Sequence, residues 1–568
     1  MNAKLFRHIF STISLLIVTP LRFLHGQDVE AVINAPPLTA NGGIAFSQIF
    51  NAAGGSGNVP NPYSYFITGN INFNSFGVVN IPLSFSFSNQ QFTGRASLPF
   101  NRFSIAPSYK WVKVYAGFTS LQFSPYTLAG HEIFGGGVEL TPPGKFRFTA
   151  IYGRLKKAED EQYDMPPVYK RMGGGFKAEY SGNTIDAGVN IFKATDDVKS
   201  LVLINPDSLS VMPQDNLSGS VYLSATITEK IRFISEYGVS VVNRNAIYDS
   251  GSFLFDLNGD IAVYHAINHN LVYSTSIGNI GASYERIAPN YSTAGAYYMT
   301  NDFENITANV STAIKNVNIA INGGFQRDDL EKQKNVATSR IIFSSAVSTP
   351  IGQKWNVGAN MSNVQSYTHI RDIYKQITQT NEFQNLDTLE YTQINLATGA
   401  NLAYQLQNSE RQNQSISANF NYQRAAEHQR YSSRQQGNNI YNGALIYLFS
   451  HIPAKWNLSA SVSYNYNQMP ENYTGTASYS LSFQKNFWEV LRGMIGATYS
   501  NMSGSAVNAT NILNVRITGG YTLLKKHNFS LTAAAVSANA QNQKNLTYTA
   551  NIAYGYSFGM TIARKDSY

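Results

Sequence analysis

Side chains that could carry out chemistry are few and scattered in this sequence. His131 and Glu132 are adjacent and could suit acid–base work, but no third partner is visible near them. The sequence contains no Gly-x-Ser-x-Gly elbow, no His-Glu-x-x-His motif and no phosphate-binding glycine loop. We therefore expect no enzyme activity, and we assign no catalytic and no cofactor-binding residue.

Two acidic stretches could be considered for a cation. The stretch from Asp256 to Asp260 (DLNGD) begins like a calcium loop, but Ile267 stands where the glutamate ligand should follow. The stretch 156–164 (KKAEDEQYD) is acidic, but it also suits a solvated loop. A hairpin tip and a solvated loop are the favoured interpretations. The chain has no cysteine, which excludes disulfides and thiolate metal sites, so we assign no metal ligand.

A third stretch, 422–436 (YQRAAEHQRYSSRQQ), is basic. It brings Arg424, Arg430 and Arg434 toward one candidate surface loop, which could attract anionic sugars or lipopolysaccharide phosphate. Ordinary loop charge is the simpler alternative. Basic residues elsewhere are scattered and not interleaved with aromatics, so we expect no nucleic-acid partner.

The composition indicates a chain that avoids charge. Only 13% of its 568 residues are charged, about half the usual share for a soluble domain, and the net charge is +8. Residues 1–26 have a basic start and an apolar stretch, which predicts a signal peptide, with an uncleaved anchor as the alternative. We expect residues 27–41 to form a periplasmic segment and residues 42–568 to form a single domain.

Long stretches of that domain alternate strictly between apolar and small polar residues. In 455–467, the even positions are apolar and the odd positions are mostly Ser and Asn. Side chains alternate faces in a strand, so each such run has one apolar and one uncharged polar face. In a membrane every backbone N–H and C=O must be paired, and only a closed sheet pairs them all between strands. The pattern predicts an all-β, antiparallel transmembrane barrel with lipid as its surroundings.

Connections of two kinds separate the runs and alternate along the chain. Short turns such as 349–355 and 451–456 contain Lys followed by Trp, and longer polar connections lie between them. Bacterial barrels have short periplasmic turns and longer extracellular loops. We therefore expect Trp111, Trp355 and Trp456 to lie at the membrane–water interface, where an amphipathic ring is well placed.

The runs give 25 strands from residue 63 onward, counting 103–109 as one. Even strand number and turn polarity require one more before residue 63, and 42–50 is the candidate, which predicts about 26 strands. The stretch 251–264 has an Asn-Gly turn and is interpreted as a hairpin tip above the membrane.

The Lys-Trp turns, the Tyr- and Asn-rich alternation and the absence of cysteine together resemble large outer-membrane β-barrels of the Bacteroidota type. This resemblance concerns architecture, and it implies an outer-membrane location in a Gram-negative envelope. Such barrels serve as import channels, as parts of secretion machinery or as scaffolds.

The predicted lumen leads to two hypotheses for function. A 26-stranded ring is about 50 Å across, too wide for Asn, Ser, Thr and Gly to fill. One hypothesis is a channel or translocation component that is occluded or gated by a plug or partner protein, with residues 27–62, 195–216 and 368–387 as candidate plugs. The alternative is a barrel that anchors surface loops or partner proteins of an envelope complex.

Overall fold

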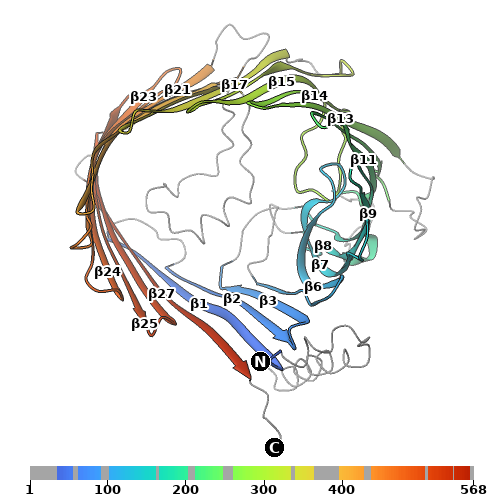
Figure 1. Cartoon of the computed structure of the whole chain (residues 1–568), viewed down its shortest axis with the longest axis horizontal. Coiled ribbons are helices and arrows are strands. Elements are labelled where there is room, and N and C mark those ends of the chain that lie inside the picture. The colour runs from blue at the N-terminus through green and yellow to red at the C-terminus, as the bar shows by residue number, and fades with distance from the viewer. Residues whose placement is uncertain are drawn as a thin grey trace, which may run out of the picture.

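The protein is a closed antiparallel barrel in its computed structural model, which describes residues 35–54, 62–90, 101–161, 166–201, 211–246, 260–333, 339–363, 396–427, 436–505, 509–540 and 543–562. The first strand, β1 (Leu38–Gly54), pairs with the last, β27 (Gln543–Ile562), and this pairing closes the ring seen in Figure 1. Closure leaves the sheet no unpaired edge. Among the described residues, no helix is long and apolar enough to cross a membrane.

The other strands pair with their neighbours in chain order, except that β4 and β5 do not pair with each other. The first half of the wall contains β2 (Tyr63–Ser75), β3 (Val79–Ser88), β4 (Arg102–Ile105), β5 (Ser108–Tyr109), β6 (Val112–Gln122), β7 (Ala129–Leu140), β8 (Phe146–Lys156), β9 (Lys170–Ser181), β10 (Ile185–Asp197), β11 (Asp215–Thr228), β12 (Ile231–Asn243), β13 (Ile261–Thr275) and β14 (Gly278–Ile287). The second half contains β15 (Phe303–Ile314), β16 (Val317–Asp328), β17 (Ser339–Ile351), β18 (Trp355–Ser362), β19 (Leu396–Asn408), β20 (Gln412–Glu427), β21 (Gln436–His451), β22 (Trp456–Gln468), β23 (Tyr473–Asn486), β24 (Leu491–Gly504), β25 (Thr510–Leu523) and β26 (His527–Ala540). A short 3₁₀ helix, Val198–Ser200, follows β10.

The barrel has 26 strand positions, as the sequence predicts. β4 and β5 share one position, because both pair with β3 on one side and with β6 on the other. The predicted strand 103–109 is thus interrupted at Ala106 and Pro107. A proline has no backbone N–H to donate to the ladder, which explains the break.

The alternating connections place both ends of the described barrel at one rim. β1 begins and β27 ends at the rim where short turns join the strands, which we call the turn end; we call the other the loop end. The predicted turns at 349–355 and 451–456 lie at the turn end. Length alone separates the two kinds of connection less well than predicted, because β26 and β27 are joined at the loop end by only 541–542.

Two predicted elements differ in their bounds or lie partly outside what the structure describes. The strand predicted at 42–50 is longer, running from Leu38 to Gly54, because β2 and β27 continue the ladder on both sides. Of the predicted hairpin 251–264, residues 261–264 begin β13, whereas 251–259 with the Asn-Gly turn lie outside the described residues, so the hairpin tip stays a prediction.

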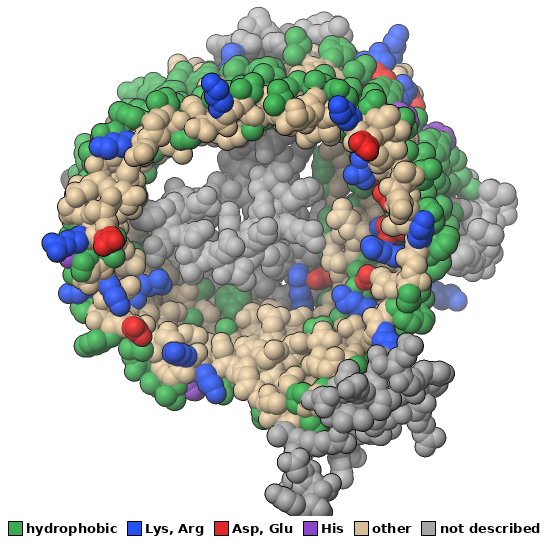
Figure 2. All heavy atoms as spheres, in the orientation of Figure 1, with side chains coloured by type: hydrophobic (Ala, Val, Ile, Leu, Met, Phe, Trp, Pro, Cys, Tyr) green, Lys and Arg blue, Asp and Glu red, His purple; other side chains and the backbone are tan. Residues whose placement is uncertain are grey.

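Alternation along each strand separates the two faces of the wall. In β22, Val462 is 50% and Tyr464 is 54% exposed, although both are apolar. Figure 2 shows hydrophobic side chains covering the outside of the ring and mainly other side chains and backbone lining its inside. The exposed apolar face is the outer one, as a lipid-embedded barrel requires.

Candidate functional site: the barrel lumen

All four tryptophans lie at the turn end. Trp111 is in the turn before β6, Trp355 and Trp456 are the first residues of β18 and β22, and Trp488 is in the turn between β23 and β24. Trp355 packs on Tyr404 with ring centroids 4.3 Å apart, and Trp456 packs on Phe449 at 4.9 Å. Trp488, which is 67% exposed and does not follow a Lys in the sequence, was not among the tryptophans predicted for this boundary.

Basic side chains accompany the tryptophans around the turn end. Figure 2 shows Lys and Arg side chains distributed around a rim of the barrel. The short turns contribute Lys110, Lys145, Lys230, Lys315, Lys354, Arg411, Lys455, Lys525 and Lys526. Tryptophan and lysine together are the residue types expected at the boundary between lipid and water.

The predicted basic loop is only partly described. Arg424 lies near the loop end of β20, opposite Leu396 of β19. Arg430 and Arg434 lie outside the described residues. The convergence of these three arginines on one loop stays a prediction.

One arc of the inner wall is almost free of charge. It runs from β21 through β27 and on to β3, and its inward positions hold mainly Asn, Ser, Thr, Gly and Ala. Arg492 and Arg516 are the charged residues at these inward positions of the described wall. Hydroxyl and amide groups pair across the strands here, as in Ser480 with Thr498 at 2.9 Å. We call this surface the uncharged arc.

The inner wall of β6 to β14 is different, because it carries charged side chains, several of which form ion pairs. Lys177 lies 2.9 Å from Glu179, and Arg232 lies 3.7 Å from Asp186. The Tyr222 hydroxyl donates to Glu179 at 3.2 Å. The lumen therefore has two unlike sides, one hydrogen-bonding and neutral, the other ionic.

Two loop-end connections fold into the lumen over the ionic side. We call residues 123–128 and 288–302 the inner loop pair. Tyr291 N donates to Ala288 O at 3.2 Å, closing a turn with Pro289 and with Asn290 at φ 59°. Proline second and a residue with positive φ third define a type II turn.

The two loops contact each other through buried groups. The Tyr291 hydroxyl donates to Tyr126 O at 2.9 Å, and the Thr293 hydroxyl donates to Thr127 O at 2.6 Å. Tyr126 and Tyr291 are 2% and 0% exposed, and their rings meet edge to face at 6.1 Å. Aromatic pairs of this geometry are stabilising beyond the area they bury.

The wall beneath the loops is shaped to receive them. Ser240 Oγ donates to Ser292 O at 2.5 Å, and Asn216 Oδ1 accepts from Ala294 N at 2.9 Å. A Cβ on Gly238 would lie 2.7 Å from Cβ of Tyr126, so a larger residue would push this loop away. The inner loop pair is thus a fixed layer on β10–β13.

Burial also holds the two tyrosines in their neutral form. It raises the pKa of both Tyr126 and Tyr291 well above the ordinary value of 10.0, and the negative charge of Glu236 adds to the effect at both hydroxyls. Glu285, which accepts from the Tyr126 hydroxyl at 3.2 Å, contributes further at Tyr126.

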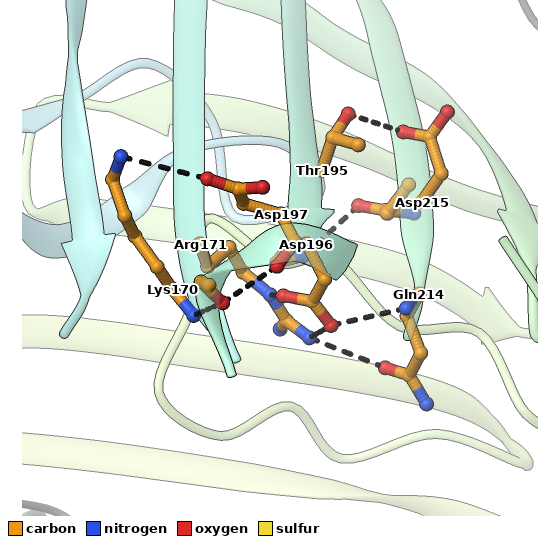
Figure 3. A network of polar contacts seen from close by, with 10 residues as sticks. Lys170, Arg171, Thr195, Asp196, Asp197, Gln214 and Asp215 are labelled. Carbon is orange, nitrogen blue, oxygen red and sulfur yellow. Dashed lines mark hydrogen bonds and ion pairs between the residues drawn. The ribbon is translucent and has the colours of Figure 1, made fainter. Parts of the chain in front are cut away.

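A second polar network joins β9, β10 and β11 at the loop end (Figure 3). Arg171 binds Asp196 through two parallel hydrogen bonds, Nε to Oδ1 at 2.7 Å and Nη2 to Oδ2 at 2.8 Å. Gln214 N donates to the same carboxylate at 3.0 Å. Asp196 is 5% exposed as a side chain, so this bidentate pair anchors the residues that follow β10.

The residues first considered for chemistry have structural partners. His131 is 4% exposed and stacks on Tyr297 of the inner loop pair, with ring centroids 4.1 Å apart. Glu132 forms an ion pair with Arg102 at 3.0 Å. The calcium-loop candidate lies, except for Asp260, outside the described residues. Of the predicted plug segments, 27–34, 55–61, 202–210 and 368–387 also lie outside them. Residues 38–54 of the first predicted plug are not a plug, because they form β1 in the wall.

Comparison with known proteins gives no family by sequence. No family model and no curated protein matches the chain. Among solved structures, the copper transporter OprC is 8% identical, with 92% of this chain and 80% of that chain covered at a TM-score of 0.36. The translocation pore of the P pilus usher PapC is 10% identical, with 93% of this chain and 100% of that chain covered at a TM-score of 0.25. P. aeruginosa FpvA, bound to pyoverdines, is 9% identical, with 91% of this chain and 72% of that chain covered at a TM-score of 0.34.

The strand number and the two faces of the barrel wall define the class of this protein. A closed ring of 26 antiparallel strands with an apolar exterior and a polar interior is a large β-barrel of the outer-membrane architecture. The resemblance to Bacteroidota barrels remains a prediction.

Proposed function

We propose that this barrel resides in the outer membrane and serves as a passage, acting as a channel or translocation component whose opening is restricted. The observation that carries the proposal is the lumen itself. A ring of this strand number is about 50 Å across between backbones, and the small side chains of the uncharged arc leave most of that width unfilled.

The two unlike sides of the lumen suit a passage better than a tight binding site. The uncharged arc offers hydroxyl and amide groups to a moving solute but almost no charge to hold it. Several charges on the opposite wall are paired, as Lys177 is with Glu179, which weakens their pull on a solute. We propose that neutral and charged solutes pass with little discrimination.

Restriction is the second part of the proposal. A permanently open hole of this width would pass small proteins and defeat the membrane as a barrier. The inner loop pair supports restriction, because two connections already fold inward and are fixed to the wall. We propose that further material, from this chain or from a plug or partner protein, completes the closure.

Single-channel conductance in planar bilayers tests both parts. We expect the full chain alone to conduct little, and a variant with 368–387 replaced by a short Gly-Ser linker to conduct far more. A steady conductance of several nanosiemens from the unaltered chain would overturn restriction. No conductance from either protein, with folding verified by heat-modifiable gel mobility, would overturn the passage.

A further inference from the structure

Two histidines of β13, His265 and His269, face outward from the barrel wall. Val263, Leu271 and Tyr273 of β13 are 52%, 46% and 42% exposed on the apolar outer face. His265 and His269 stand an even number of residues from these side chains along β13, so both rings lie on the same, outer side of the sheet. Figure 2 shows histidine and charged side chains on the outer surface in this part of the ring.

The height of His269 is unusual for a polar side chain. It lies six residues from the turn end of β13 at Thr275. With a rise of about 2.6 Å per residue along the barrel axis, this places it about 16 Å above the turns, within an apolar band about 25 Å tall. At outward positions of the other described strands, Asp, Glu, Lys, Arg and His lie within four residues of a strand end, as Lys193 and Arg424 do.

Each ring has only one of its two nitrogens hydrogen-bonded to a described residue. His265 Nδ1 lies 2.7 Å from the Tyr237 hydroxyl, and His269 Nδ1 lies 2.9 Å from Ser235 Oγ. Nε2 of each ring has no hydrogen bond to a described residue. A polar atom in hydrocarbon without a partner is costly, so a surrounding of lipid alone does not suit this surface.

Above the histidines, toward the loop end, the same outer face carries more donors than acceptors. Glu304 lies between Arg286, at 3.7 Å, and Arg327, with which it also forms an ion pair. The Tyr284 hydroxyl donates to the same carboxylate at 2.8 Å. Two guanidinium groups thus share one carboxylate, while their side chains remain 43% and 54% exposed.

We propose that the outer face of β12–β16 docks a second, different membrane-embedded protein that presents carboxylates or other acceptors to this surface. Charge and hydrogen-bond complementarity select that occupant. A lipid phosphate could reach Arg286 and Arg327, but it would leave His269 in hydrocarbon. A second copy of this chain using the same face would set arginines against arginines, which is repulsive.

A photo-crosslinker tests the proposal in the native membrane. Benzoylphenylalanine at Leu271, between the histidines and the turn end, should form an adduct with another protein. The matched control is the same probe at Leu531 of β26, which is also outward and 45% exposed. We expect the adduct at Leu271 only, and we expect H265F/H269F to reduce it about tenfold, as loss of a hydrogen bond to a charged group would.

Three outcomes would overturn the proposal: no protein adduct at Leu271, equal adducts at both probe positions, or an adduct that is a second copy of this 62.7 kDa chain. An adduct that survives H265F/H269F unchanged would also overturn it. Folding of the variant is checked separately in pure phospholipid, where phenylalanine at outward positions is expected to leave heat-modifiable mobility intact. H527F, at the turn end of β26, serves as the control substitution and should leave the adduct unchanged.

Discussion

The Tyr291 hydroxyl lies 2.9 Å from the carbonyl oxygen of Tyr126, a residue 165 positions earlier in the chain. Both residues are buried inside the lumen, against the wall of β10–β13. This hydrogen bond joins two connections that would otherwise extend from the loop end. It makes the inner loop pair one unit, whose attachment can be tested apart from the barrel.

Replacing Gly238 should detach that unit. In G238V, the new side chain would overlap the Tyr126 ring, and overpacking of this kind costs about 1–3 kcal/mol. We expect residues 288–302 to become cleavable by protease while the barrel stays folded. In the matched control G219A, the new Cβ meets Asn190 O at an ordinary 3.6 Å, so the cleavage rate should match that of the unaltered chain. Equal cleavage of the two variants would contradict the close packing of Tyr126 against Gly238.

Alkaline pH should loosen the same contact. Burial raises the pKa of Tyr126 and Tyr291, so their stabilising effect is complete below the unfolded value near 10 and is lost as pH rises further. Amide hydrogen exchange in 288–302, corrected for its intrinsic pH dependence, should accelerate as the pH rises above 10, where the unfolded tyrosine begins to ionise. The Y126F/Y291F variant should start faster but show little additional acceleration. If the unaltered chain and Y126F/Y291F responded to pH in the same way, ionisation of these two tyrosines would not be the cause.

Breaking the bidentate pair at the loop end should be costly. R171A leaves the Asp196 carboxylate buried without its main partner, and removal of one member of such a pair costs about 3–5 kcal/mol. The double variant R171L/D196L removes both charges and should recover much of that loss. Unfolding in urea, followed by tryptophan fluorescence, measures the free energy of unfolding of each variant. Additive losses would mean that the two side chains do not interact as Figure 3 shows.

The faces of β22 predict unequal costs for lysine. V462K places a charge on the lipid face and should cost about 2–4 kcal/mol near the midplane, whereas S461K faces water in the lumen and should cost much less. Folding free energies in phospholipid bilayers measure the difference. Equal costs would show that the register of this strand is wrong.

The period of the sequence was sufficient to predict the wall. Strand number, turn polarity and the faces of β22 all follow from alternation, because a strand with lipid on one side must alternate. The break at Pro107 needed the structure, since 103–109 alternates as though it were a single strand. The position of Trp488 at the membrane boundary was not predicted, because the prediction rested on Lys-Trp pairs and Trp488 follows Phe487.

Contacts between distant segments could not be predicted in the same way. Nothing near Tyr126 in the sequence indicates that Tyr291 will lie beside it. A usable signal was present, however: Phe123, Tyr126 and Leu128 are apolar residues in a connection that should be polar if it extends into water. His265 and His269 likewise stood at apolar positions of an alternating run, and that irregularity marked the outer face of β13.

Passage of solutes through the lumen can be tested by cysteine accessibility, because the chain has no native cysteine. In the variant with 368–387 replaced by a linker, Ser461 and Val462 are changed to Cys one at a time and exposed to a charged methanethiosulfonate during conductance recording. The account predicts that S461C is modified and its conductance falls, while V462C does not respond. Conductance that is insensitive at position 461, or equally sensitive at both positions, would contradict passage through this lumen.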